Sequence, residues 1–139
     1  MYSRDHALGS LALAVVLLLA TTPPGHPAVL LAVVVGVGVG IDFDHFLVAS
    51  LNTGSTKNLR RVLRSPKIVF LDQRAIFDPD DLSPLQRLLS HVVLAGLAVF
   101  GLVALGEHGW ATVVGLTLYL HVLCDLIADV RNEAGTASS

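Results

Sequence analysis

Apolar and polar residues separate into long blocks along the chain, rather than alternating at the period of a strand or a surface helix. Four stretches are almost entirely apolar, covering about 7–22, 28–51, 85–105 and 110–127. About 20 apolar residues suffice for a helix to cross a bilayer. The pattern predicts an all-α integral membrane protein: one domain of four transmembrane helices over 1–131, and a disordered tail over 132–139.

The first stretch is the shortest, and Arg4 precedes it as a basic residue precedes the apolar core of a signal peptide. It ends in the sequence TTPP over 21–24, which lacks the small-residue cleavage pattern of such peptides. We therefore expect a retained helix, and a cleaved signal peptide is the alternative.

The connections differ in length. Those at 23–27 (PPGHP) and 106–109 (GEHG) are short and rich in turn formers, so they predict an up-down-up-down bundle. The connection over 52–84 is long, and its segment 56–64 (TKNLRRVLR) is typical of an amphipathic helix in the lipid headgroup layer. A turn at 78–81 (DPDD) and a helix start at Ser83-Pro84 follow it.

Charge predicts the orientation of the bundle. All nine Lys and Arg lie in the N-terminal segment, in the long loop with the start of the third span, or in the tail. Basic residues beside transmembrane helices stay on the cytoplasmic side. We therefore expect both termini and the long loop to be cytoplasmic, in the cell or inner membrane.

Composition agrees with a membrane protein, since 53% of residues are hydrophobic and 14% are charged. A net charge of −2 and an aromatic content of 6% offer neither a basic surface nor a stacking platform, so nucleic acid is not an expected partner. Membrane lipids are expected partners, and a homo-oligomer is left open. The single Cys124 excludes an internal disulfide, and we interpret it as a core residue rather than a soft metal ligand.

Three glycines, Gly36, Gly38 and Gly40, interrupt the second apolar stretch and contain one G-x-x-x-G pair. Such small residues let two membrane helices approach closely. A phosphate-binding loop would follow a strand, and no strand precedes them. We therefore interpret the glycines as a packing surface.

Ionisable residues inside the apolar spans are costly, so each requires a partner or a task. Counted from the short connections at 1.5 Å per residue, they lie at one depth, ~18 to 27 Å from the outer face. Imidazole and carboxylate together are ligands of zinc, manganese or iron. The alternative is buried ion pairs or His–Asp hydrogen bonds that fix helix packing. The residues at this depth are His6, Asp42, Asp44, His45, His91, His121 and Asp125.

Spacing places several of these residues on shared helix faces. His121 and Asp125 are four residues apart, and Asp129 continues their face by one turn. Asp42 is three residues from the histidine of its own span and shares its face. Arg87 lies one turn before the candidate ligand of the third span, so a cation is expected beside the cluster.

These elements resemble the YdjM-like, LexA-regulated family of membrane-bound metal-dependent hydrolases. The family pattern has a His near the N-terminus, a D-[IL]-D-H element, an H-R-G-x-T-H-S element and a final H-x-x-x-D. The corresponding segments here are 5–9 (DHALG), 42–45 (DFDH), 86–91 (QRLLSH) and 121–125 (HVLCD). The third departs from the pattern, since Gln86 replaces the first His and the Gly is missing.

That family is in turn distantly similar to zinc phospholipases C and zinc-dependent nucleases, which cleave phosphoesters with clustered zinc ions. The resemblance gives Asp44 the role of a ligand, an orienting residue or a base. It implies metal ligands at His6, Asp42, His45, His91, His121 and Asp125.

We therefore expect a hydrolase that depends on a divalent transition metal, with zinc favoured over manganese or iron. Its expected substrate is a lipid-like phosphoester at the cytoplasmic interface. Asp44 would accept the proton of the attacking water, and Arg87 would hold a phosphoryl oxygen. A protease is disfavoured because the chain contains no HExxH. A transporter is disfavoured because the outer halves of the spans are apolar. A non-catalytic metal-binding or structural membrane protein is the remaining alternative.

Overall fold

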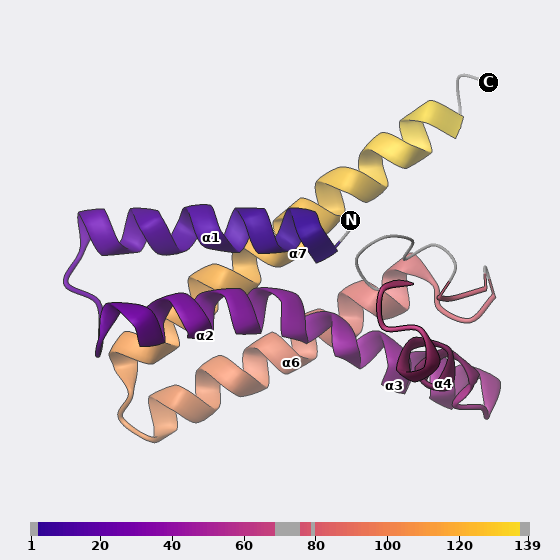
Figure 1. Cartoon of the computed structure of the whole chain (residues 1–139), viewed down its shortest axis with the longest axis horizontal. Helices are drawn as coiled ribbons and strands as arrows, with labels where there is room; N and C mark the ends of the chain where they lie inside the picture. Colours follow the sequence, from indigo (N-terminus) through magenta and orange to yellow (C-terminus); the bar gives the residue numbers. More distant parts are fainter. Residues whose placement is uncertain (1–2, 69–75, 79, 137–139) are drawn as a thin grey trace.

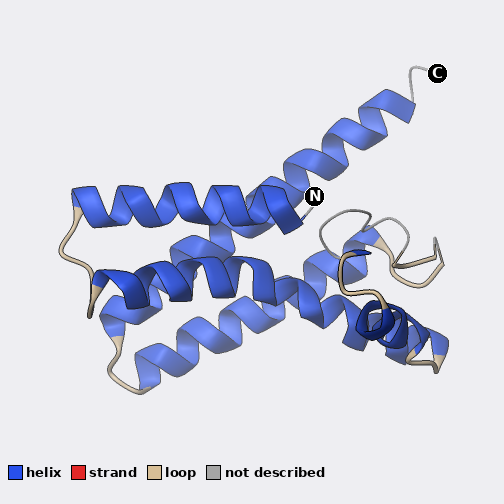
Figure 2. Cartoon of the chain, viewed as in Figure 1, coloured by secondary structure: helices blue, strands red, loops and turns tan. Residues whose placement is uncertain are grey.

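The computed structural model describes residues 3–68, 76–78 and 80–136, and the regular structure in that part of the chain is entirely helical (Figure 2). The predicted all-α class is therefore confirmed. The elements in chain order are α1 (Ser3–Ala20), α2 (Pro27–Gly40), the 3₁₀ turn η1 (Ile41–Phe43), α3 (Asp44–Thr53), α4 (Lys57–Arg64), α6 (Pro84–Ala104) and α7 (His108–Thr136) (Figure 1).

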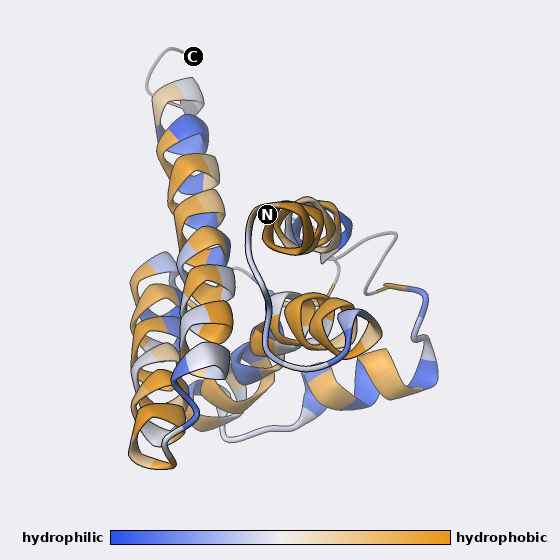
Figure 3. Cartoon of the chain, turned by 90° about the vertical axis from the view of Figure 1, so that its left-hand side faces the viewer, coloured by the Kyte–Doolittle hydropathy of each residue, from blue (hydrophilic) through white to orange (hydrophobic). Residues whose placement is uncertain are grey.

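Three helical segments are long and apolar enough to cross a membrane: Pro27–Thr53, Pro84–Ala104 and His108–Gly135. Only 6% of the α6 segment is buried inside the protein, so most of its apolar surface faces outward. Figure 3 shows that apolar residues make up most of the length of the long helices. Because water solvates such surfaces poorly, the protein is suited to association with a membrane. The fourth predicted span, α1, is not among the three.

The helices are arranged as two hairpins. α1 packs on α2, and α6 packs on α7. α7 also contacts α1 and α2, and it therefore joins the hairpins (Figure 1). The side chains at the centre of this packing are Ala14, Leu17, Leu30, Val34 and Val113.

Helix starts follow from local capping. Ser83 caps α6: its hydroxyl accepts from the Gln86 amide, and the Gln86 side chain accepts from the Ser83 amide, with Pro84 as the first helical residue. The predicted start at Ser83-Pro84 is thus confirmed. At α2, the side chain of His26 accepts a hydrogen bond from the Ala28 amide at 3.2 Å.

One glycine brings α1, α2 and α7 together. A Cβ at Gly38 would lie 2.0 Å from Ser10 Oγ and 3.3 Å from Thr117 Cγ2, so only glycine fits there unless Ser10 or a neighbouring helix shifts. The predicted packing role is therefore confirmed at Gly38. For the G-x-x-x-G pair it is wrong, because a Cβ at Gly36 or Gly40 meets nothing within 4 Å.

The long loop contains the predicted amphipathic helix as α4, and its turn at 78–81 is held by an Asp81 amide that donates to the Asp78 carbonyl at 3.0 Å. Pro79 lies outside the described residues. Lys57, 2.9 Å from the Asp81 carboxylate, is the largest cause that lowers the pKa of Asp81 to about 2. Asn58 donates to the same carboxylate at 2.9 Å, so this acid anchors α4 to the turn.

The prediction of a disordered tail from residue 132 is wrong for 132–136, because α7 continues to Thr136. Figure 1 shows this end of α7 extending beyond the other helices. The residues 137–139 lie outside the described part of the chain.

Candidate metal centre

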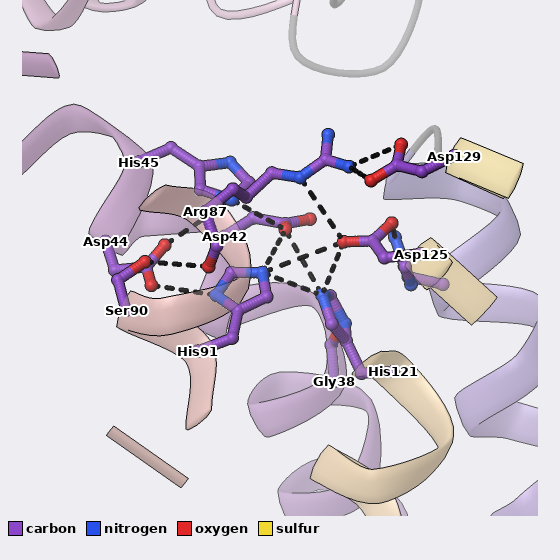
Figure 4. A network of polar contacts seen from close by, with 11 residues as sticks. Gly38, Asp42, Asp44, His45, Arg87, Ser90, His91, His121, Asp125 and Asp129 are labelled. Carbon is purple, nitrogen blue, oxygen red and sulfur yellow. Dashed lines mark hydrogen bonds and ion pairs between the residues drawn. The ribbon is translucent and has the colours of Figure 1, made fainter. Parts of the chain in front are cut away.

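The polar residues expected at one depth meet where α1, η1, α3, α6 and α7 converge (Figure 4). They form two groups, and in each group the candidate ligand atoms lie within 4.8 Å of one another. Asp42 belongs to both groups. The first group is His6, Asp42, His121 and Asp125, and the second is Asp42, His45 and His91. The structure thus brings together all six residues predicted as metal ligands.

In the first group, the imidazole of His121 has a fixed orientation. Its Nδ1 lies 2.7 Å from the Gly38 carbonyl, which can only accept, so Nδ1 carries the proton. Its Nε2 then faces the cluster, 3.3 Å from Asp42 Oδ1. His6 stacks on this ring with a centroid distance of 3.8 Å, and its Nε2 lies 3.1 Å from Asp125 Oδ1.

In the second group, His91 is oriented by a carboxylate. Its Nδ1 donates to Asp44 Oδ2 at 2.8 Å, which leaves Nε2 directed at Asp42 Oδ1, 3.5 Å away. The ring of His45 stacks on His91 with a centroid distance of 4.8 Å. A carboxylate behind a histidine in this way fixes both the tautomer and the direction of the ligand nitrogen.

The two groups are in direct contact, because the Nε2 atoms of His91 and His121 are 3.3 Å apart. Both rings carry a proton on Nδ1, so in their neutral forms two lone pairs face one another beside the Asp42 carboxylate. Lone pairs and a carboxylate in such a space repel each other unless a proton or a cation lies among them. The site therefore suits either a metal ion or a buried imidazolium.

Two further atoms in or beside these groups lack hydrogen bonds among the described residues. Asp44 Oδ1 and His45 Nε2 are buried, and within the described part of the chain neither has a hydrogen-bond partner. They lie 3.6 Å apart. Because buried polar atoms almost always have partners, these two unsatisfied atoms fit a site built to hold a cation.

The cluster is largely enclosed, with partial exposure at Asp42 and His45. The side chains of Asp42 and His45 are 15% and 12% exposed, whereas those of His91 and His121 are at most 2% exposed. A cavity of about 160 Å³ lies against the cluster between α6 and α7. Its polar lining includes Arg87, His91 and three acids, Asp125, Asp129 and Glu133, and its apolar lining includes Leu88, Leu126 and Val130.

Arg87 lies beside the cluster as predicted, but its guanidinium already has a partner. Nη2 donates to both carboxylate oxygens of Asp129, at 2.8 and 2.6 Å, and Nε is 3.9 Å from Asp125 Oδ2. The sequence pattern placed Asp129 on the face of Asp125 but gave it no role. Their shared face placed Asp129 near the cluster but did not predict its pairing with Arg87.

Gln86, the departure from the family pattern, lies outside both groups of candidate ligands. Its side chain caps α6 and exchanges two hydrogen bonds with Asn52, at 2.9 and 3.1 Å. It therefore links the start of α6 to the end of α3. The presence of Gln86 in place of the family's His therefore leaves all the members of the two groups in place.

Several other polar residues are not in the cluster. Cys124 is half-buried and belongs to neither group, which agrees with its interpretation as a packing residue. His26 and His108 are exposed at the hairpin turns. The Gly38 carbonyl that orients His121 carried no signal in the sequence, because every residue has a backbone carbonyl.

Comparisons with family models, curated proteins and solved structures found no match for this chain. The fold and the site therefore define the general class of protein to which this chain belongs. The chain is a helical protein with membrane-type apolar helices and a buried histidine–aspartate cluster that could hold a metal ion.

Proposed function

We propose that this chain is an integral membrane protein of four spans, in which α1 crosses the bilayer together with the three longer helices. The support is the apolar surface that α1 presents outward, since Leu8, Leu11, Val15, Val16 and Leu19 are exposed. The basic residues favour an orientation in which both termini and the loop over 52–84 are cytoplasmic. Cysteine-accessibility labelling at Thr56 and His108 tests this orientation, and labelling of position 56 from outside intact cells would contradict it.

We further propose that the cluster binds a divalent transition metal, with zinc favoured by its imidazole and carboxylate donors and manganese or iron as alternatives. The observation that carries this proposal is the pair of inward-facing Nε2 atoms, on His91 and His121, beside a carboxylate shared by both groups. The proposed ligands are the six residues of the two groups. Asp42, common to both groups, would contribute its carboxylate to either.

The reaction that this site supports best is hydrolysis of a lipid-like phosphoester, as expected for a YdjM-like hydrolase. A divalent ion bound there supplies an activated water and polarises a phosphoryl oxygen. Asp44 orients His91 through Oδ2, and its unsatisfied Oδ1 is available to accept a proton. The cavity between α6 and α7 offers apolar walls for an acyl or isoprenoid chain.

Arg87 has a defined task in this proposal. It stands at the wall of the cavity, where its cation can stabilise the charge that develops on a phosphoryl group. Only Nη2 of the guanidinium binds Asp129, so Arg87 keeps donors that can bind a substrate oxygen while the ion pair stays in place. Asp129 then acts as a positioning residue that holds Arg87 in place before the substrate binds.

A second candidate function is non-catalytic, namely metal binding or structural support. The observation that favours it is the ion pair between Arg87 and Asp129, because Asp129 neutralises the cation that a phosphoester substrate would need. A protein of this kind would bind metal through the cluster and turn over no phosphoester.

One experiment separates these functions. Protein purified in detergent is stripped with chelator, reloaded with zinc, manganese or iron, and assayed for phosphate or headgroup release from phospholipids and isoprenoid phosphates in mixed micelles. The hydrolase proposal expects release that depends on metal and is absent in His45→Ala. Full metal loading without any release would favour the non-catalytic function, and absence of metal in every preparation would contradict both.

A further inference from the structure

Helix α4 differs from every other helix in its direction. Figure 1 shows α4 viewed along its axis, whereas α1 and α2 run across the picture, so α4 lies across the end of the bundle. It follows α3 after a short connection in which Gly54 adopts a φ of +63°. A helix in this position lies parallel to the membrane surface if the long helices cross the bilayer.

The two sides of α4 have different surroundings. Asn58 and Val62 are buried against the protein. On the outward side, the side chains of Leu59 and Leu63 are 37% and 72% exposed. Exposed Arg60 and Arg64 form a second stripe directly beside these leucines, since both pairs are four residues apart.

The basic residues of α4 divide into two pairs. Lys57 contacts Asp78 at 2.8 Å and Asp81 at 2.9 Å, and Arg61 donates to the Ile76 carbonyl at 2.8 Å, so these two cations hold the loop together. By contrast, no acidic side chain among the described residues forms an ion pair with Arg60 or Arg64. The outward stripe therefore has positive charge without a partner in the described protein.

We propose that the outward face of α4, formed by Leu59, Arg60, Leu63 and Arg64, is a binding surface for anionic lipid headgroups. The two leucines insert among the upper parts of the acyl chains, and the two guanidinium groups bind lipid phosphates. Arginine suits this task because its planar donors match phosphate oxygens in pairs. The inference goes beyond the metal centre and does not depend on whether the protein is a hydrolase.

The test places an environment-sensitive fluorophore on the full-length protein at Leu63→Cys in a Cys124→Ala background. The protein is reconstituted in equal mixtures of phosphatidylglycerol and phosphatidylcholine, in which either one or the other lipid is brominated and quenches the fluorophore. The ratio of the two quenching efficiencies reports which lipid is enriched next to α4. A second probe at Leu59→Cys repeats the measurement if the first variant folds poorly.

We expect brominated phosphatidylglycerol to quench more strongly, and Arg60→Gln/Arg64→Gln to lower this preference by up to about 25-fold, since each of the two basic residues near an anionic surface contributes about fivefold. Salt at about 1 M should weaken the preference, because it screens surface charges. The matched control is Arg131→Gln, which removes a basic residue from the end of α7 and should leave the ratio unchanged.

Three results would overturn this proposal. Equal quenching by the two lipids would show that α4 does not select anionic headgroups, and an equal loss in the Arg131→Gln control would show only an effect of total charge. A fluorophore whose emission depends on protein density in the vesicles, and not on lipid, would show that a second copy of the chain covers α4.

Discussion

The two ends of the helical bundle hold the histidines of this chain in opposite environments. At the hairpin turns, His26 and His108 are exposed, and the imidazole of His26 accepts a bond from the Ala28 amide as a helix cap. At the other end, four histidines from four helices are enclosed with three carboxylates: His6, His45, His91 and His121 with Asp42, Asp44 and Asp125. A histidine alone is therefore a weak signal, whereas histidines and acids at one depth on separate helices indicate a site.

The largest expected effect separates the two ends directly. His121→Ala removes an inward-facing Nε2 from the first group. We expect the metal content of this variant to fall about tenfold or more, because loss of a residue that merely orients a metal ligand already lowers metal affinity about 10–100-fold. His108→Ala, the matched control at the hairpin turn, should keep its metal. Elemental analysis of both variants checks this prediction, and equal losses would remove the distinction between the two ends.

Arg87→Ala should come next in size. We expect turnover of a phosphoester to fall by about 10² to 10³ while metal content stays nearly unchanged, the usual range for removal of one electrostatic stabiliser. Asp129→Asn is the control, because it weakens the ion pair but leaves the guanidinium beside the cavity. Asp129 only positions this guanidinium, so its substitution should cause the smaller loss, and unchanged turnover in Arg87→Ala would contradict the role of its cation in the reaction.

Two substitutions of Asp44 separate its roles. In Asp44→Asn the amide oxygen can still accept from His91 Nδ1, so metal should stay bound while turnover falls through loss of the base. In Asp44→Ala nothing orients His91, and metal affinity should fall about 10–100-fold. Metal titration and turnover assays measure the two effects. Full activity in Asp44→Asn would exclude this carboxylate as the base.

A smaller effect tests the packing that builds the cluster. Gly38→Ala should lower the free energy of unfolding by about 1–3 kcal/mol, since the added Cβ would lie 2.0 Å from Ser10 Oγ. Gly36→Ala, where a Cβ meets nothing within 4 Å, should cause no such loss. Unfolding in detergent, followed by circular dichroism, compares the two. Equal stability would show that α1 adjusts to the larger side chain.

The smallest expected effect lies in the loop, away from the cluster. Lys57, with smaller contributions from the Asp78 amide and Asn58, lowers the pKa of Asp81 in the folded protein from 3.8 to about 2, so these contacts stabilise the loop above about pH 4. That contribution should be lost as the pH falls from about 4 through 2. A fluorophore on α4 should report release of the helix over this range. At neutral pH, Asp81→Asn should increase tryptic cleavage at α4, whereas the exposed Asp80→Asn should not; equal cleavage would contradict the anchoring role.

The sequence predicted the depth of the cluster because depth follows from residue count along each helix. This is why His6 on α1 and His91 on α6 could be assigned together although 85 residues separate them in sequence. The short connections supplied the common reference point. The helical class and the start of α6 at Ser83-Pro84 were predicted from equally local signals.

The contacts within the cluster could not be predicted, because they depend on how each helix is rotated and where it approaches its neighbours. Gly38 allows α1 and α7 to come close to α2, and this approach lets its carbonyl orient His121. The 3₁₀ turn η1 also changes the local helical spacing at Asp42, which belongs to both groups. The pairing of Arg87 with Asp129 likewise depends on the crossing of α6 and α7.

The central claim is that the cluster holds a metal and is not a set of packing ion pairs. Elemental analysis of the wild-type protein, purified in detergent without added metal or chelator, tests it most directly. We predict at least one transition-metal ion per chain, with zinc the most abundant. A content below about 0.2 ions per chain, unchanged after zinc is supplied and the excess removed, would contradict the claim and leave a network of buried His–Asp pairs.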